Sequence, residues 1–254
     1  MAYQRVRDIS LYYEDEGEGR PLLLLHGWGT SGRTWHAQLA DLVRDHRVVT
    51  VDWRGCGRSD RPARGNTAAN VVADLAEFVD ALGLRGAVVV GSSIGATFAT
   101  ELALRHPDRV GGVVAVGGPA YWPSAGMTDL VRSLRVDLVA DRPGTLSGWV
   151  PKWFAPGTSP ATIDWTIRQI LDSGVYIDEL LTESTGYDPR PSLPSLEVPI
   201  GYVHGRLDTE IPLEVAKDCA SRTPGAELIV LESGHMPPLE TPAEFTEALR
   251  TLIR

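Results

Sequence analysis

The sequence predicts an α/β protein in which helices cover both faces of a mostly parallel, twisted sheet. Short apolar runs typical of buried strands alternate with helical segments in the first part of the chain and again near its end. Between these parts, residues 121–190 carry no strong strand signal, which predicts a helical insertion. Because parallel strands need long crossover connections, usually helices, the alternation favours a parallel sheet with both faces covered.

The size and charge of the chain restrict its class. Its 254 residues fit one α/β domain with an insertion as well as two small domains, and its net charge of -9 argues against a nucleic-acid partner. Two cysteines, Cys56 and Cys219, do not indicate a disulfide scaffold. The N-terminus lacks an apolar secretion segment, and the apolar run at 21–25 is too short to span a bilayer. We therefore expect a cytoplasmic protein without membrane contacts, and its oligomeric state stays open.

The first part of the chain supplies strands and one long helix. Residues 5–6 and 10–14 resemble an opening hairpin, and the runs at 22–25 and 48–51 are typical of buried strands. The spacing of apolar residues predicts a helix at 67–82. Five of these residues share one helical face: Val71, Leu75, Phe78, Val79 and Leu82.

A glycine-flanked serine lies between a predicted strand and a predicted helix. The run at 87–90 indicates a buried strand, residues 96–104 indicate a helix, and 110–116 indicate the next strand. The intervening turn, Gly91–Gly95, places Ser93 at the centre of Gly-x-Ser-x-Gly. Such a sharp turn leaves little room, so its flanking positions need glycine, and it holds the serine oxygen out at the top of a sheet. This context makes Ser93 a candidate nucleophile.

The segment at 121–190 is rich in aromatic residues, and its prolines and glycines predict several short helices. Strand signals resume at 198–203 and 228–231, and a final helix is expected at 242–252. The predicted division is a core of residues 1–120 and 191–254 with a helical cap of residues 121–190 inserted in it.

Four tryptophans of the predicted cap are candidates for contacts with a substrate. Packing of a small helical layer explains them equally well, and both explanations can hold together. The candidates are Trp122, Trp149, Trp153 and Trp165. An aromatic cap favours a small, largely apolar molecule as the substrate.

A nucleophilic serine needs a base within hydrogen-bond reach, and the base needs an orienting acid. His235 lies just beyond the last apolar strand, at the sheet edge that also carries Ser93, and is the expected base. Asp208 follows the strand at 198–203 and is the expected acid, whereas Glu232 is expected to be a solvated loop carboxylate.

The other five histidines are expected to be structural. His26 and His204 each end a strand just before a glycine, so both could lie near the site. The helical surroundings of His36, His46 and His106 predict positions at the surface.

Two backbone N–H groups are candidate donors to an oxyanion. Ile94 directly follows the candidate nucleophile. Trp28 lies in the loop His26–Gly29, where two glycines let the backbone approach closely.

Residues 52–59 form a second glycine-dependent loop, which Asp52 and Arg54 are expected to hold by hydrogen bonds. Cys56 has no obvious histidine partner, which favours a buried, inert thiol. The loop lacks Gly-x-Gly-x-x-Gly spacing, so a dinucleotide site is rejected. Since no cluster of histidine, cysteine or carboxylate has metal-ligand spacing, neither a metal nor a cofactor is expected.

Five motifs in this order resemble the α/β-hydrolase superfamily, and the resemblance runs from about Tyr12 to the C-terminus. The motifs are His26–Gly29, Asp52–Ser59, Gly91–Gly95, His204–Asp208 and Ser233–His235. The resemblance implies Ser93 as nucleophile, Asp208 as acid and His235 as base, with a helical cap over the pocket. The first motif looks like that of the pimeloyl-ester carboxylesterases, and the compact chain resembles the cofactor-free perhydrolase esterases. Those branches usually carry methionine or leucine where this chain has Ile94.

The resemblance implies a serine hydrolase that cleaves an ester or related carbonyl bond of a small, largely apolar substrate through an acyl-enzyme. Three alternatives of the same fold stay open. They are a cofactor-free dioxygenase, a C–C bond hydrolase, and a small-molecule receptor that keeps the triad.

Overall fold

The computed structural model describes residues 2–254 and contains one eight-stranded sheet. The strands lie in the order β1-β2-β4-β3-β5-β6-β7-β8, and every pairing from β4 to β8 is parallel. β2 pairs antiparallel with β1 and with β4. Their bounds are β1 (Ala2–Val6), β2 (Ile9–Glu16), β3 (Arg20–Leu25), β4 (His46–Val51), β5 (Ala87–Ser92), β6 (Val110–Val116), β7 (Ile200–Gly205) and β8 (Glu227–Leu231). The predicted α/β class and mostly parallel sheet are confirmed.

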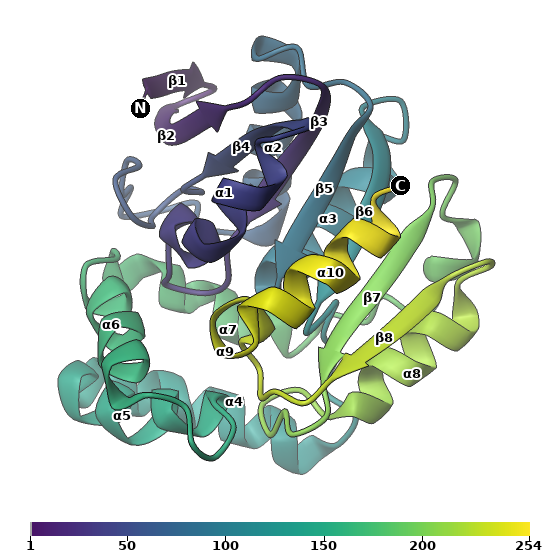
Figure 1. Cartoon of the computed structure of the whole chain (residues 1–254). Helices are drawn as coiled ribbons and strands as arrows, with labels where there is room; N and C mark the ends of the chain where they lie inside the picture. Colours follow the sequence, from purple (N-terminus) through teal and green to yellow (C-terminus); the bar gives the residue numbers. More distant parts are fainter. Residues whose placement is uncertain (1) are drawn as a thin grey trace.

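Helices cover both faces of this sheet (Figure 1). One face carries α1 (His36–Leu42) and α10 (Pro242–Leu252), and the other carries α2 (Ala68–Ala81), α3 (Ile94–Arg105) and α8 (Leu213–Arg222). Leu22 and Leu24 of β3 enter the core under α1 and α10, together with Trp35 of the short turn η1 (Gly32–Trp35). Leu23 and Leu25 enter the opposite core, because successive side chains of a strand point to opposite faces.

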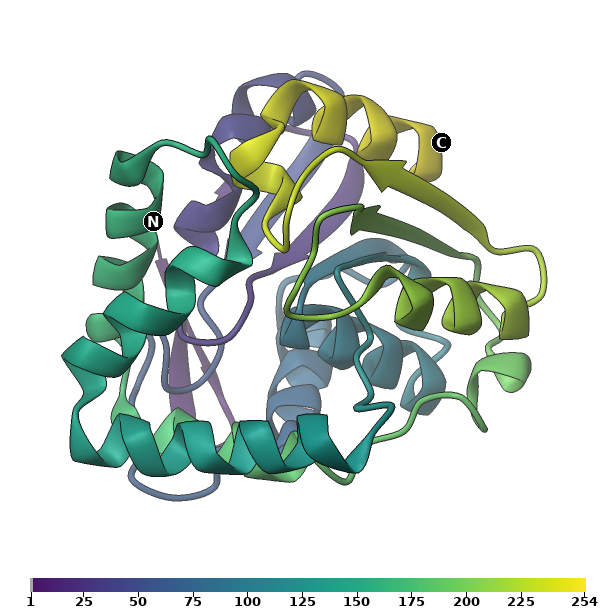
Figure 2. The same cartoon turned by 90° about the horizontal axis from the view of Figure 1, so that it is seen from below.

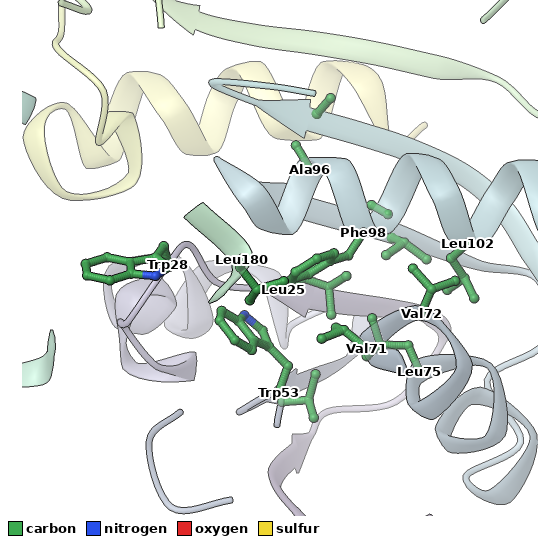
Figure 3. Packing of buried hydrophobic residues seen from close by; sticks show 14 of the residues in the cluster. Leu25, Trp28, Trp53, Val71, Val72, Leu75, Ala96, Phe98, Leu102 and Leu180 are labelled. Carbon is green, nitrogen blue, oxygen red and sulfur yellow. The ribbon is translucent and has the colours of Figure 1, made fainter. Parts of the chain in front are cut away.

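The larger core lies between the sheet and helices α2 and α3 (Figure 3). Trp53 packs edge-on against Phe98 of α3, with ring centroids 5.5 Å apart, and Leu25 lies beside them. Leu180 of the inserted helix α7 (Glu179–Ser184) joins the same cluster. Burial of each such side chain contributes roughly 1.5–3 kcal/mol, so the insertion is anchored to the core by apolar packing.

Between β6 and β7 the part of the chain that the structure describes forms helices and no strand. These elements are α4 (Ala125–Ala140), α5 (Arg142–Trp149), η2 (Val150–Trp153), α6 (Pro160–Leu171), η3 (Val175–Asp178), α7 and η4 (Leu193–Ser195). Helices α4 to α6 border one end of the sheet, seen from below in Figure 2. Pro143, Pro151 and Pro160 each lie in the first turn of a helix, where a missing N–H removes no hydrogen bond. The several short helices predicted for this segment are present.

A few boundaries differ from the predicted ones. The strand expected from Val198 begins at Ile200, because Pro199 has no N–H to donate to a ladder. β2 extends to Glu16, beyond the predicted hairpin, because Glu16 pairs with Val48 of β4. None of the described helices has both the length and the apolar character that crossing a membrane requires.

Candidate active site

Ser93 occupies a strained turn between β5 and α3. Its φ of 55° and ψ of -122° lie in a region that residues other than glycine rarely adopt. The flanking glycines are required by space: a Cβ on Gly95 would lie 2.6 Å from the carbonyl oxygens of Leu25 and His26, and one on Gly91 would collide with Gly95. The Ser93 N–H donates to the carbonyl of Val116 (2.7 Å), which ties the turn to β6. The predicted strand–turn–helix is therefore present and tightly packed.

His235 and Asp208 form a buried pair. His235 Nδ1 lies 2.7 Å from Asp208 Oδ2, and the two residues are 3% and 8% exposed. The other carboxylate oxygen, Oδ1, accepts the backbone N–H groups of Glu210 (2.8 Å) and Ile211 (2.9 Å). The loop after β7 thus holds Oδ1 of Asp208, and its Oδ2 orients the imidazole that follows β8.

The two members of this pair shift each other's pKa. Burial opposes the charged imidazolium of His235, but the negative charge and hydrogen bond of Asp208 outweigh burial and raise its pKa. Burial also opposes the Asp208 carboxylate, but the charge and hydrogen bond of His235 outweigh it and lower the pKa of Asp208. The ionised carboxylate can therefore stabilise a protonated imidazole beside it.

The structure brings His204, but no surface histidine, beside this pair within the described residues. His204 Nε2 lies 2.8 Å from the carbonyl oxygen of Ile211 and 3.3 Å from Asp208 Oδ2. Burial lowers the pKa of His204, so its neutral ring donates to Ile211 and faces Asp208. His26 has a structural place instead: its ring stacks on Trp53 at 5.0 Å, and burial lowers its pKa to about 4.

The loop after β3 passes directly beside the serine. A Cβ on Gly27 would lie 3.4 Å from Ser93 Cβ, so the backbone before Trp28 lies within van der Waals reach of the serine. Ile94 begins α3, and the positive end of that helix dipole therefore points at the same region. Both candidate oxyanion donors lie on chain segments next to Ser93.

A cavity of about 900 Å³, measured to its open mouth, joins the core to the inserted segment. Ser93 and His235 both line it, as do Trp28 and Ile94. The inserted segment contributes tryptophans at three of the four predicted positions: Trp122, Trp149 and Trp153. The expected nucleophile and base thus share one chamber with most of the expected aromatic contacts.

Trp165 is the exception and requires a correction. It lies in α6, outside the lining of the cavity, and its ring packs against His36 of α1 at 5.3 Å. Trp165 therefore has a packing role between helices and makes no contact with the cavity.

Several lining residues had not been predicted from the sequence. Leu180, Leu181 and Tyr187 reach the cavity from the inserted segment, and Glu210 reaches it from the loop of Asp208. The leucines and Tyr187 carry no sequence signal, because their position depends on how the inserted helices pack. Glu210 has one usable signal, since it stands two residues after the predicted acid.

Glu240 is a second residue that sequence reasoning missed. Its Oε2 accepts the backbone N–H groups of Ala155 (2.6 Å) and Gly234 (3.0 Å), and its Oε1 accepts that of Met236 (2.9 Å). Between these donors, the N–H of His235 donates to the carbonyl of Trp153 (2.6 Å). One carboxylate therefore fixes the backbone on both sides of His235 and joins it to the inserted segment.

The loop at 52–59 is held as predicted. Asp52 accepts the backbone N–H groups of Gly32 (2.7 Å) and Arg58 (2.8 Å). Arg54 pairs with Asp74 of α2 through Nε at 2.6 Å. Cys56 is buried, and burial raises the pKa of its thiol well above the usual range, which keeps it protonated. Within residues 2–254, no three histidine, cysteine or acidic side chains gather as metal ligands would.

The fold and these contacts together define a class of protein. A serine on a strand–turn–helix, with an aspartate and a histidine after later strands of a mostly parallel sheet, is the arrangement of α/β hydrolases. A family model described as alpha/beta hydrolase fold matches residues 20–242, and the chain belongs to that family.

Known proteins resemble the chain over nearly its whole length. It is 30% identical over 243 residues to AB hydrolase superfamily protein YisY of Bacillus subtilis, with 89% of each chain covered. It is 30% identical over 253 residues to the pimeloyl-(acyl-carrier protein) methyl ester esterase of Vibrio cholerae, covering 93% of this chain and 94% of that protein. An esterase from Exiguobacterium antarcticum has a similar structure, with a TM-score of 0.91, 28% identity and 96% of both chains covered.

Proposed function

We propose that this protein is a serine hydrolase that cleaves a carboxylic ester of a small, largely apolar substrate through an acyl-enzyme. One observation carries the proposal: the strained Ser93 and His235, whose Nδ1 is bound to the buried Asp208, border a single cavity. The names of the similar proteins, a methyl ester esterase and an esterase among them, support the same reaction class.

The reaction follows from the position of each group. Since Nδ1 of His235 is bound to Asp208, Nε2 is the nitrogen that takes the proton from Ser93 Oγ as that oxygen attacks the ester carbonyl. The N–H groups of Trp28 and Ile94 stabilise the oxyanion. His235 then gives the proton to the leaving alcohol, which leaves the acyl group on Ser93.

The second half of the reaction uses the same groups on water. Nε2 of His235 takes a proton from a water molecule, which attacks the acyl carbonyl and releases the carboxylic acid. In both halves, Asp208 keeps the imidazole in the required tautomer and stabilises its protonated form. No step needs a residue outside the cavity and the loop of Asp208.

The inserted segment, residues 121–190, acts as a cap that selects the substrate. Its side chains form much of the wall facing Ser93, and most of that wall is apolar. Leu180 and Leu181 lie on the same wall as Trp122, Trp149 and Trp153. An apolar wall binds the non-reacting part of a substrate and excludes water from the oxyanion.

A panel of aryl esters graded by acyl length tests the proposal. Ser93→Ala should lower kcat by on the order of 10³-fold or more, because the triad acts as a unit. Ser92→Ala is the matched control, since the Ser92 hydroxyl is buried without a hydrogen-bond partner and its loss should leave turnover intact. Full activity in Ser93→Ala, or one turnover per molecule in the unaltered protein, would contradict the proposal.

A further inference from the structure

The cavity contains a carboxyl group that the proposed reaction does not use. Glu210 lines the cavity, and its Oε2 accepts the indole N–H of Trp149 at 2.9 Å. Its backbone N–H is bound to Asp208, so the side chain extends from a segment that the acid already fixes. Glu210 is partly buried; burial raises its pKa, and the charge of His235 opposes that rise.

Three indole rings form a continuous wall from the oxyanion loop to the base. The ring of Trp149 lies 5.4 Å from that of Trp28 and 4.9 Å from that of Trp153, and the latter contact is perpendicular. Trp153 in turn lies 6.2 Å from the ring of His235. Indole faces carry negative electrostatic potential and attract cations, most strongly where water is excluded. The ring that binds Glu210 is the middle one of the three.

The charges around the cavity reinforce this potential. Among the described residues that line it, Glu183 and Glu210 are acidic, and none is lysine or arginine. Glu183 is exposed, so water screens its charge and Glu210 supplies most of the negative potential. The positive charge of Lys152 attracts the Glu210 carboxylate, but Lys152 is exposed and water screens its charge. Arg142 lies 5.4 Å from the Trp28 ring, outside the lining, and its charge is paired with Asp178 at 2.7 Å.

We propose that this cavity selects esters that carry an alkylammonium group, held by the Glu210 carboxylate and the indole rings of Trp149 and Trp153. The inference rests on the proposed ester hydrolysis and names its substrate class. A bound cation would restore to Glu210 the charge stabilisation that burial removes. It would also make cation–π contacts with the faces of the indole rings, which a neutral apolar chain cannot make.

Pairs of esters that differ only in charge test this inference. In each pair one ester ends in a trimethylammonium group and its partner ends in tert-butyl, which has nearly the same shape. One pair carries the group on the alcohol and the other on the acyl chain. In at least one pair, kcat/KM should favour the cation by on the order of ten-fold. Glu210→Gln should abolish that preference, which is a ratio within each pair and so does not depend on any general change in turnover. Glu227→Gln, which alters an exposed residue of β8, should leave the preference intact.

A binding measurement separates this inference from the proposed reaction. Tetramethylammonium should quench the tryptophan fluorescence of Ser93→Ala saturably, and adding Glu210→Gln should weaken the binding about ten-fold. If the neutral esters turn over but neither cationic ester is preferred, the inference fails and the proposed function stands. If no ester turns over, the proposed function fails, and absence of saturable quenching would refute the inference as well. A preference that survives Glu210→Gln would also overturn it.

Discussion

Glu240 offers a direct test of how the loop of the proposed base, His235, is held. Replacing it by glutamine keeps the size but leaves one acceptor oxygen. In the more favourable of its two orientations, the glutamine oxygen still accepts the N–H groups of Ala155 and Gly234. Its NH2 group then faces the N–H of Met236, and two donors meet without an acceptor. A hydrogen bond to a charged group contributes about 1.5–3 kcal/mol, and the retained bonds weaken when the charge is lost. We therefore expect Glu240→Gln to lower the free energy of unfolding by about 2–4 kcal/mol.

The same substitution should affect turnover, because the released N–H belongs to Met236, which directly follows His235, and the bond kept by Gly234 on the other side is weakened. A displacement of about 1 Å at a reacting group can cost on the order of 10²-fold in rate. Urea unfolding followed by tryptophan fluorescence gives the stability, and kcat/KM on an aryl ester gives the activity. Glu244→Gln, an exposed residue of α10, is the control and should stay within about 0.5 kcal/mol of the unaltered protein. The reasoning is refuted if Glu240→Gln matches this control in both measurements.

Three further predictions concern the turn, the base and the buried ion pair. Gly95→Ala should lower the free energy of unfolding by about 1–3 kcal/mol in urea titrations and reduce kcat, because its Cβ would overlap two backbone carbonyls. The rate should rise with pH through the pKa of His235, above the ordinary 6.5, since only the neutral imidazole accepts a proton. Asp208→Asn should move that limb to lower pH and cost on the order of 10⁴-fold in kcat. Asp74→Ala should destabilise the fold by about 3–5 kcal/mol in urea titrations, because it leaves the Arg54 guanidinium buried without its main partner.

Each of these predictions has a clear contrary outcome. An unfolding midpoint for Gly95→Ala equal to that of Gly126→Ala, where a new Cβ meets nothing within 4 Å, would remove the steric argument. A pH profile whose acidic limb does not move in Asp208→Asn would show that the aspartate does not tune His235. A loss below about 1 kcal/mol in Asp74→Ala would mean that Arg54 finds other partners.

The sequence was most informative where local backbone requirements define the structure. Gly91 and Gly95 indicate a tight turn around Ser93, because a side chain at either position would collide with the backbone. Apolar runs indicate the strands before and after it. Parallel strands end at one edge of a sheet, so Asp208 and His235 could be expected to meet although the chain separates them. The 2.7 Å contact between their side chains agrees with that expectation.

The rest of the site depends on contacts between distant segments, which leave no periodic pattern in the sequence. Trp165 is aromatic, like the residues that line the cavity, but the packing of α6 places its ring against His36. Tyr187 reaches the cavity only because the end of the insertion folds back over α3, where its hydroxyl bonds Glu101 (3.1 Å). Glu240 reads as an ordinary acidic residue before a proline helix start, and only the assembled fold brings three N–H groups to it.

The stretch 152–155 has a consequence for remodelling this enzyme. Its carbonyl at Lys152 accepts the hydroxyl of Thr209 (2.8 Å), next to the acid, and its carbonyl at Trp153 accepts the N–H of His235 (2.6 Å). A transplant that replaces the whole insertion with that of a relative would therefore disturb the proposed acid and base as well as the proposed choice of substrate. Variation confined to α7, whose Leu180 and Leu181 line the chamber, can reshape it while this short scaffold stays in place.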